Sequence, residues 1–280
     1  MRSFIAAALA AYAAADASDH WAVIMAGSNT FGNYRHQADT NHAVKIMLAN
    51  GIPRDHIIHL SYDDVANSSY NPYPGQLFNK PITGSVSQAE LDAANVYDKS
   101  NTDYRGKDVT AQNFYNVLLG DDSNGPALKS NENSHVFLNF ADHGGVGLLG
   151  VPYYCGDYIY ADELNNVLKQ MHDKKMFKQL TFYVEACESG SMFPDLSDDL
   201  DIYAITATNA SSSSWGTYCG SDAYVGDEYI GSCLGDLFSV NWMEDSDAND
   251  LSVETLAEQA ATVKRETDLS PVQQFGDLSW

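Results

Sequence analysis

The sequence has few basic residues and no long run of them. Its 280 residues include 15 Lys and Arg against 38 Asp and Glu, a formal net charge of −23 with histidine neutral. Binding to nucleic-acid phosphates needs clustered cations, and no run of Lys or Arg here is longer than that at Lys174-Lys175. A nucleic-acid partner is therefore excluded, while a hydrophobic content of 44% is ample for a packed core.

Long apolar runs are also missing after the first residues. Phe4 to Ala15 is uncharged and mostly apolar, follows Arg2 and ends in small residues, as a signal peptide does. A buried amphipathic helix is the alternative, but the segment has no polar face. The run is too short for a permanent membrane anchor. We therefore expect a signal peptide at residues 1–17 and a single domain at residues 18–280.

Cysteine is scarce, and its four residues allow three full pairings. Cys219 and Cys233 flank a Gly- and Asp-containing stretch that is typical of an exposed loop. A bridge between them would remove about 3 kcal/mol of unfolded-chain entropy. This pairing would leave Cys155 and Cys187 as free thiols.

Two sequons accompany the predicted entry into the secretory pathway. Asn67 begins Asn67-Ser68-Ser69, and Asn209 begins Asn209-Ala210-Ser211. Such matches also arise by chance, so both asparagines are candidates for glycosylation and neither is assigned.

Metal-ligand spacing is absent from the sequence. The acidic run at residues 195–201 lacks the turn glycine of an EF-hand loop and is typical of a solvated loop. We therefore predict no metal and no cofactor. Six histidines are scattered without the H-E-x-x-H pattern, namely His20, His42, His56, His59, His135 and His172.

Short apolar runs alternate with helical patterns along the chain. This alternation predicts an α/β fold with a parallel sheet. The Pro- and Asn-containing stretch at residues 67–105 is typical of a long surface excursion. The predicted strands are 21–26, 57–60, 136–141, 180–184 and 202–206, and the predicted helices are 36–50, 109–119, 161–175 and 253–266.

Polar clusters follow two of these strands directly. His143 comes after the strand at 136–141, and Cys187 comes after the strand at 180–184. The carboxyl ends of parallel strands are where open sheets place their chemistry, so the two side chains should be neighbours. A cysteine beside a histidine suits acyl transfer, in which the thiolate attacks and the imidazole carries the proton. A buried structural cysteine with a partner histidine is the alternative on spacing alone.

Longer motifs in the same order resemble the legumain family of asparaginyl endopeptidases, or vacuolar processing enzymes. The resemblance covers nearly all of residues 19–278, and Ser214-Trp215-Gly216-Thr217-Tyr218-Cys219 is most similar to plant-type members. The other matching stretches are Ala26-Gly27-Ser28-Asn29, Asn33-Tyr34-Arg35-His36-Gln37-Ala38-Asp39, Asn50-Gly51-Ile52-Pro53, Tyr62-Asp63-Asp64, Asp142-His143-Gly144, Glu185-Ala186-Cys187-Glu188-Ser189-Gly190-Ser191, Leu234-Gly235-Asp236-Leu237 and Asn241-Trp242-Met243-Glu244-Asp245-Ser246.

The resemblance implies roles for the residues at the strand ends. Cys187 matches the family nucleophile, His143 the general base and Asn33 the residue that orients the imidazole. The backbone N–H groups of Gly144 and Cys187 match the oxyanion hole. The implied fold is a caspase-like three-layer α/β/α sandwich with a mostly parallel sheet of about six strands.

The resemblance also implies a specificity pocket for asparagine. It maps onto Arg35, His36, Glu185, Ser214 and Asp236. Arg35 would donate to the side-chain amide oxygen, and the two carboxylates would accept from its NH₂ group. Asp would enter at acidic pH, where the substrate acid or a pocket carboxyl holds a proton. Without the motif, Arg35, His36 and Asp39 would be interpreted as a solvated helix start with its own ion pairs.

These matches predict a cysteine endopeptidase that cleaves peptides after Asn, and after Asp more slowly, in an acidic vacuolar or lysosomal lumen or outside the cell. A peptide ligase of the same fold is the alternative, because an amine can intercept the acyl-enzyme instead of water. A transamidase subunit that attaches lipid anchors and a catalytically silent binding glycoprotein fit less well. Members usually carry a helical prodomain after the catalytic domain. This sequence ends at Trp280, so the given residues hold no prodomain, and either the sequence is truncated or this member lacks one. The oligomeric state is open.

Overall fold

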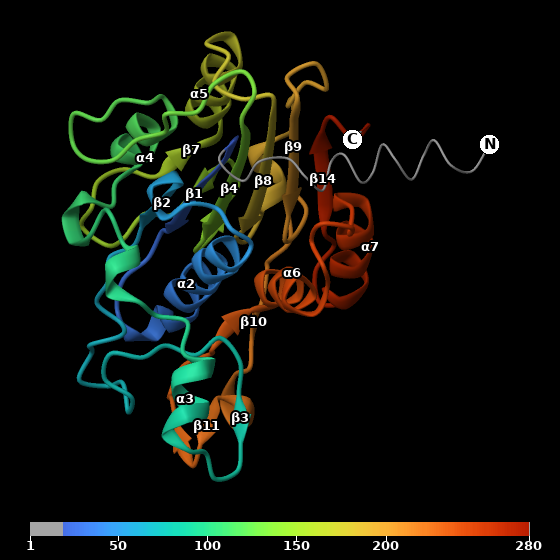
Figure 1. Cartoon of the computed structure of the whole chain (residues 1–280). Helices are drawn as coiled ribbons and strands as arrows, with labels where there is room; N and C mark the ends of the chain where they lie inside the picture. The colour runs from blue at the N-terminus through green and yellow to red at the C-terminus, as the bar shows by residue number, and fades with distance from the viewer. Residues whose placement is uncertain (1–18, 280) are drawn as a thin grey trace.

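The computed structural model describes residues 19–279, and the predicted signal peptide at residues 1–17 lies outside them. A six-stranded sheet crosses the middle of the molecule in the order β14-β9-β8-β4-β1-β2 (Figure 1). Five of its strands are parallel, and only β14 runs antiparallel to its neighbour β9. The strands are β1 (His20–Ala26), β2 (Ile57–Leu60), β4 (His135–Ala141), β8 (Gln179–Glu185), β9 (Ile202–Thr206) and β14 (Gln273–Gly276).

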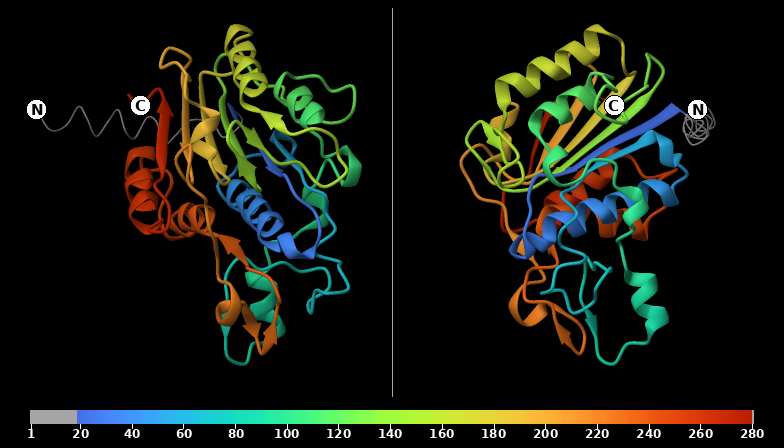
Figure 2. Two further views of the ribbon diagram at one scale, coloured as in Figure 1. Left: turned by 180° about the vertical axis from the view of Figure 1, so that it is seen from behind. Right: turned by 90° about the vertical axis from the view of Figure 1, so that its left-hand side faces the viewer.

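Helices cover both faces of this sheet, which makes three layers (Figure 2). Apolar side chains of α4 and α5 pack on one face, and those of α2, α6 and α7 pack on the other. Strands buried on both sides are apolar without alternation, which is why β1 and β9 read as continuous apolar runs. The helices are α2 (Tyr34–Ala49), α4 (Ala111–Leu118), α5 (Ala161–Asp173), α6 (Leu237–Ala248) and α7 (Leu256–Glu266).

A smaller lobe lies beyond one edge of the sheet layers (Figure 1). It contains α3 (Gln88–Ala94), and β3 (Ile82–Thr83) pairs with β11 (Tyr224–Gly226), which pairs with β12 (Glu228–Tyr229). Leu77, Phe78 and Val225 are fully buried in its own apolar cluster. The prediction of a surface excursion at residues 67–105 was therefore wrong in part: buried residues among the prolines fold this stretch against residues 223–234.

Two short sheets lie close to the strand ends. One is formed by β5 (Gly144–Gly145), β6 (Leu148–Leu149) and β7 (Ile159–Tyr160). The other pairs β10 (Gly216–Thr217) with β13 (Gly235–Asp236) in antiparallel register.

A disulfide joins Cys219 to Cys233, as the sequence predicted, and leaves Cys155 and Cys187 as free thiols. The stretch between the bonded cysteines is more than an exposed loop. It holds the β11–β12 hairpin, whose Val225 is fully buried. The expectation of an exposed loop was wrong in part: residues 220–222 and 227–229 are exposed, but Ala223, Val225 and Ile230 are buried in the apolar cluster of the smaller lobe.

The predicted strands are confirmed to within one residue at each end, and the predicted helices differ by up to three residues at one end. The edge strand β14 was missed. Its sequence, Gln-Gln-Phe-Gly, has one apolar residue and no alternation, so only the neighbouring strand selects an extended conformation for it. Within residues 19–279, no helix is long and apolar enough to cross a membrane.

Candidate active site

The two polar clusters predicted to be neighbours leave the sheet side by side. Strands β4 and β8 pair in parallel, with Ala141 opposite Glu185. The pairing continues one residue further, because the backbone N–H of Asp142 donates to the carbonyl of Glu185 at 3.1 Å. His143 and Cys187 each lie two residues beyond the paired positions, so the parallel register brings them to the same edge of the sheet.

His143 is oriented from the start of α2. Its Nε2 lies 2.9 Å from Oδ1 of Asn33, and Nδ2 of Asn33 donates to the carbonyl of Asn29 at 2.9 Å. That second bond fixes the amide orientation, so Oδ1 is the acceptor and His143 Nε2 carries the hydrogen. The neutral imidazole therefore has its lone pair on Nδ1, which is the nitrogen able to take a proton.

Cys187 lies half-buried against Ser214. Its Sγ is 3.8 Å from the Ser214 carbonyl, and the Ser214 hydroxyl is 3.9 Å from the same sulfur. Among the hydrogen bonds of residues 19–279, none joins Cys187 to His143. The next residue, Glu188, has a left-handed backbone with φ of 51°, so the chain turns sharply away just after the sulfur.

Gly144 follows the histidine and packs against the cysteine backbone. A Cβ atom added to it would lie 2.5 Å from the carbonyl oxygen of Cys187, so only glycine fits there. The backbones of Gly144 and Cys187, predicted as oxyanion-hole donors, are therefore adjacent. Their role as donors remains a prediction.

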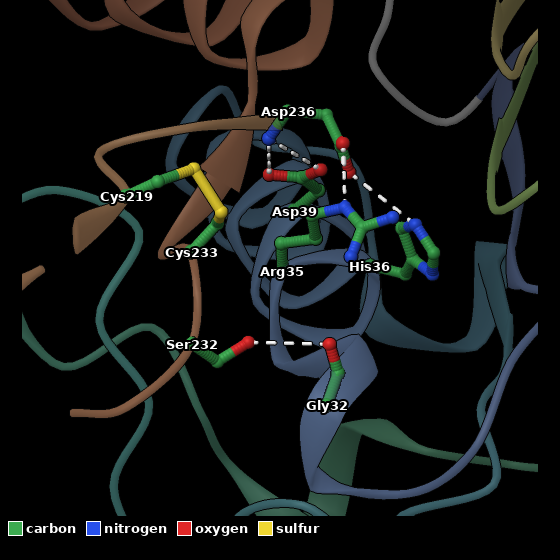
Figure 3. The surroundings of a disulfide bond; sticks show 8 residues. All are labelled: Gly32, Arg35, His36, Asp39, Cys219, Ser232, Cys233 and Asp236. Carbon is green, nitrogen blue, oxygen red and sulfur yellow. Dashed lines mark hydrogen bonds and ion pairs between the residues drawn. A yellow bond between two sulfur atoms is a disulfide. The ribbon is translucent and has the colours of Figure 1, made fainter. Parts of the chain in front are cut away.

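Arg35, His36 and Asp236 meet beside these strand ends (Figure 3). Arg35 Nε donates to Oδ1 of Asp236 at 2.8 Å, with side-chain exposures of 17% and 5%. His36 Nε2 lies 3.6 Å from Oδ2 of the same carboxylate. Asp236 pairs with Gly216, whose absent Cβ would lie 3.3 Å from Arg35 Cδ, so glycine lets the arginine pass under this strand.

The pocket contains buried acceptors without partners. Glu185 is 1% exposed, and its Oε2 accepts from both the backbone N–H and the hydroxyl of Ser239, at 2.9 and 3.1 Å. Its Oε1 and the Oδ2 of Asp236 are buried and have no hydrogen-bond partner. Of the hydrogen bonds within residues 19–279, Arg35 donates only the one from Nε. Two acceptors and the terminal nitrogens of a guanidinium thus have no hydrogen-bond partner among residues 19–279.

Burial sets the protonation of the pocket. Burial and the charge of Asp236 raise the pKa of Glu185 to about 8, against smaller lowering effects of Ser239 and Ser214. Burial lowers the pKa of Arg35 by itself, but Asp236 and the other pocket carboxylates outweigh it, so the pKa lies above its usual value. Burial holds the pKa of His36 well below its ordinary range. His36 is therefore neutral, and Glu185 holds a proton at neutral pH when the pocket is empty.

Asp142 and Ser28 surround the other side of His36. The Nδ1 of His36 is 2.7 Å from the Ser28 hydroxyl and 3.2 Å from Oδ1 of Asp142. Burial raises the pKa of Asp142 to about 7. Donor atoms of His36, Asp142 and His143 all lie within 4.8 Å of one another, but His36 Nδ1 already contacts Ser28. The expectation that no metal binds remains a prediction.

A model of the peptidase C13 family matches residues 20–280. The chain belongs to the peptidase C13 family.

Curated relatives of the chain in this family come from plants and animals. The vacuolar-processing enzyme delta-isozyme of Arabidopsis thaliana is 47% identical over 251 residues, which covers 88% of this chain and 51% of that protein. Legumain of Mus musculus is 45% identical over 270 residues, covering 94% and 58%. Hemoglobinase of Schistosoma mansoni is 44% identical over 262 residues, covering 93% and 57%. The chain thus spans about half the length of the curated relatives it matches. The predicted membership of the legumain and vacuolar-processing-enzyme family is confirmed.

One solved structure bears on the fold alone. Caspase-1 from Spodoptera frugiperda superposes with a TM-score of 0.53 at 10% identity, covering 94% of this chain and 88% of that one. Together with the six-stranded, mostly parallel sheet between helix layers, this confirms the predicted caspase-like α/β/α class.

The sequence predicted the site residues of the C13 motifs, but it did not show which neighbouring residues contact and orient them. Asn29 fixes the amide of Asn33, and Asp142 contacts His36. Asp39 lies one helical turn after Arg35 and accepts from the backbone N–H of Asp236. The signals were present, because Asp142 precedes His143 and Asp39 follows Arg35 by four residues, but only the fold shows what they contact.

Proposed function

We propose that the chain is a cysteine endopeptidase that hydrolyses peptide bonds on the carboxyl side of Asn, and of Asp more slowly at acidic pH. One observation carries the specificity. Arg35 offers unused donors in a pocket where Glu185 Oε1 and Asp236 Oδ2 are buried acceptors without partners. A carboxamide has one acceptor end and one donor end, so it complements this set.

Cys187 is proposed as the nucleophile and His143 as the base. His143 Nδ1 takes the thiol proton, and the sulfur attacks the carbonyl carbon of the Asn residue. The tetrahedral oxyanion is stabilised by the backbone N–H groups of Gly144 and Cys187. The amine then leaves with the proton from His143, and a thioester remains on the sulfur.

Hydrolysis of the thioester completes the cycle. His143 removes a proton from water as the water attacks the thioester carbonyl, and the thiolate leaves and is reprotonated. Asn33 keeps the imidazole in the tautomer with hydrogen on Nε2, which supports the use of Nδ1 in both steps.

The pocket accounts for the proposed difference between Asn and Asp. For Asn, Arg35 donates to the amide oxygen, while Asp236 accepts from the NH₂ group together with Glu185, which releases its proton when the amide binds. For Asp, a protonated Glu185 supplies a donor to the second carboxylate oxygen. His36 and Ser214 complete the wall, with His36 beside Asp236 and Ser214 beside the sulfur.

The proposed setting is an acidic lumen of the secretory pathway, vacuolar or lysosomal, or the cell exterior. A disulfide supports an oxidising route, and similarity to an enzyme named for vacuolar processing supports the compartment. Residues 1–17 are proposed as the signal peptide. Asn67 is exposed and Asn209 is half-buried, and both remain candidates for glycosylation.

Three fluorogenic peptides that differ only in Asn, Asp or Arg before the scissile bond test the proposal, at acidic to neutral pH with a thiol reductant. We expect cleavage after Asn, slower cleavage after Asp that increases as pH falls, and none after Arg. Cys187→Ala should abolish all turnover and leave the melting temperature close to that of the wild type. An active Cys187→Ala protein would contradict the assignment of the nucleophile.

The same assay separates hydrolysis from peptide ligation. A second peptide with a free amino terminus is added, and the products are resolved by mass. Under the proposed function, the acid product of hydrolysis predominates. Predominance of the joined peptide would assign the chain as a ligase of the same fold.

A further inference from the structure

Asp39 contacts the backbone of Asp236. The carboxylate of Asp39 is 1% exposed, and its two oxygens lie 3.2 and 3.4 Å from the backbone nitrogen of Asp236 (Figure 3). The side chain of Asp236 in turn accepts from Arg35. The position of Asp39 therefore decides where the pocket carboxylate lies.

Asn79, from the smaller lobe, holds Asp39. Its Nδ2 donates to Oδ1 of Asp39 at 2.7 Å and to the carbonyl of Leu234 at 3.0 Å. Both partners are acceptors, so the amide orientation is fixed and Oδ1 points away from them. Asn79 is 4% exposed, which makes it a buried link between the smaller lobe and the pocket.

His42 supports the other end of Asn79. His42 Nδ1 lies 2.9 Å from Asn79 Oδ1, and its Nε2 lies 3.0 Å from Oδ2 of Asp247. The imidazole is 9% exposed and the carboxylate 45% exposed, so the series of contacts ends at the surface. We call Asp39, Asn79, His42 and Asp247 the support network.

Gly235 has no side chain and so leaves room for the support network beside the strand that carries Asp236. A Cβ added to Gly235 would lie 2.8 Å from Asn79 Nδ2 and 3.0 Å from Asp39 Oδ1. Gly235 immediately precedes Asp236, so the absence of a side chain there lets the amide and the carboxylate approach the strand that carries the pocket residue.

We propose that Asn79, supported by His42 and Asp247, is a positioning residue for substrate specificity. It fixes Asp39, Asp39 fixes the backbone of Asp236, and the carboxylate of Asp236 is thereby held against Arg35. This inference rests on the proposed function. Asn79 acts through Asp39 and has no contact with the reacting atoms.

The position of Asp39 should depend strongly on the hydrogen bond that Asn79 donates to it. Burial and the nearby Asp236 raise the pKa of Asp39 well above its usual value, and Asn79 acts in the opposite direction. Loss of the donor leaves the buried carboxyl group of Asp39 with only the longer contacts to the backbone N–H of Asp236, which is costly. An aspartate at position 79 would also place a second carboxyl group against Asp39, and the pair would separate or share a proton.

The test compares Asn79→Asp with Asn71→Asp. Asn71 is a matched control, since it is also 4% exposed and its Nδ2 also donates to two acceptors, which are the backbone carbonyls of Ala66 and Gln76. The expected result for Asn79→Asp is a KM for the Asn peptide about tenfold higher or more, with kcat changed far less. Asn71→Asp should keep the wild-type KM. Equal KM values in the two variants would overturn the inference.

Alkylation of Cys187 by N-ethylmaleimide, which has no primary carboxamide for the specificity pocket, separates a pocket effect from a general loss of structure. Asn79→Asp should react at the wild-type rate, and a large loss of that reactivity would show a structural defect and count against a positioning role. Absence of Asn cleavage by the wild type would instead contradict the proposed function.

His42→Ala keeps the inference testable if Asn79→Asp does not fold. The expected result is again a raised KM with little change in kcat, smaller than for Asn79→Asp because the change is one contact further away. His172→Ala is the matched control, since His172 also lies beside an aspartate, Asp173 at 3.6 Å, on a different helix. A wild-type KM for His42→Ala would overturn the inference.

Discussion

A single buried carboxyl group accounts for most of the chemistry of the proposed pocket. Both donors from Ser239 go to Oε2 of Glu185, so a proton held by this side chain resides on Oε1, the atom without a partner. Burial and Asp236 raise the pKa of Glu185 to about 8. Oε1 therefore changes from an acceptor to a donor when it gains a proton, and the preferred substrate side chain changes with it.

In Glu185→Gln, the position of Oε1 should hold a hydrogen-bond donor at every pH. The glutamine keeps an acceptor toward Ser239 and presents an NH₂ group in place of Oε1. We expect kcat/KM for the Asn peptide to fall by about tenfold, while Asp cleavage rises relative to Asn cleavage, most strongly above about pH 8, where Glu185 of the wild type loses its proton. Paired measurements of kcat/KM at several pH values check this.

Glu188→Gln is the matched control for this variant, because it makes the same substitution three residues further along the chain, outside the set of predicted pocket residues. An unchanged ratio of Asn to Asp cleavage in Glu185→Gln would contradict the role given to Glu185.

At the scale of elements, two parallel strands and a short antiparallel pair build the site. Strands β4 and β8 deliver the histidine and the cysteine to one edge, and the β10–β13 pair delivers Asp236 across from them. The disulfide lies against the second pair, since Cys233 Sγ would be 3.3 Å from a Cβ at Gly216. The disulfide thus restrains the strand that borders Arg35.

Replacing both Cys219 and Cys233 by Ser should therefore affect stability and specificity together. The unfolded chain regains about 3 kcal/mol of entropy, which corresponds to a melting temperature lower by roughly 5–10 °C. We also expect a raised KM for the Asn peptide, because the β10 strand is less restrained. Differential scanning calorimetry and peptide kinetics measure the two effects, with Cys155→Ser as the control that leaves the disulfide intact. An unchanged KM would show that the disulfide serves stability alone.

Some elements of the fold could be predicted from the sequence, and others could not. Apolar runs located the buried strands, and the residues that follow them located His143 and Cys187. The strand β14 and the smaller lobe were not predictable, because their conformations depend on partners far away in the sequence. The contacts of Asp39 with Asp236 were beyond sequence reasoning for the same reason, since helix α2 and strand β13 are about 200 residues apart.

Over the whole molecule, the buried carboxyl groups and the net charge of −23 both make the free energy of unfolding fall as pH rises. Burial raises the pKa of Glu185 to about 8 and that of Asp142 to about 7. The folded protein thus holds protons that the unfolded chain has released by neutral pH. Since the unfolded state binds fewer protons in this window, the free energy of unfolding falls as pH rises.

We predict a decrease in the free energy of unfolding between about pH 5 and pH 8, of up to about 1.4 kcal/mol per pH unit for each proton held. Urea unfolding at intervals of one pH unit measures it. Added salt screens repulsion between surface charges but has little effect on buried groups, so the slope should persist at high ionic strength. Glu185→Gln and Asp142→Asn should each reduce it. A free energy that is constant or rises with pH would contradict the protonation described for the pocket.

Affinity labelling tests at once whether Cys187 is the nucleophile and whether the site selects Asn. Three otherwise identical peptidyl chloromethyl ketones ending in Asn, Arg or Leu are incubated with the protein, and the modified residue is mapped by peptide mass spectrometry. We predict rapid labelling of Cys187 by the Asn reagent and little labelling by the other two. Equal labelling by all three, or labelling by the Asn reagent at a residue other than Cys187, would contradict the account.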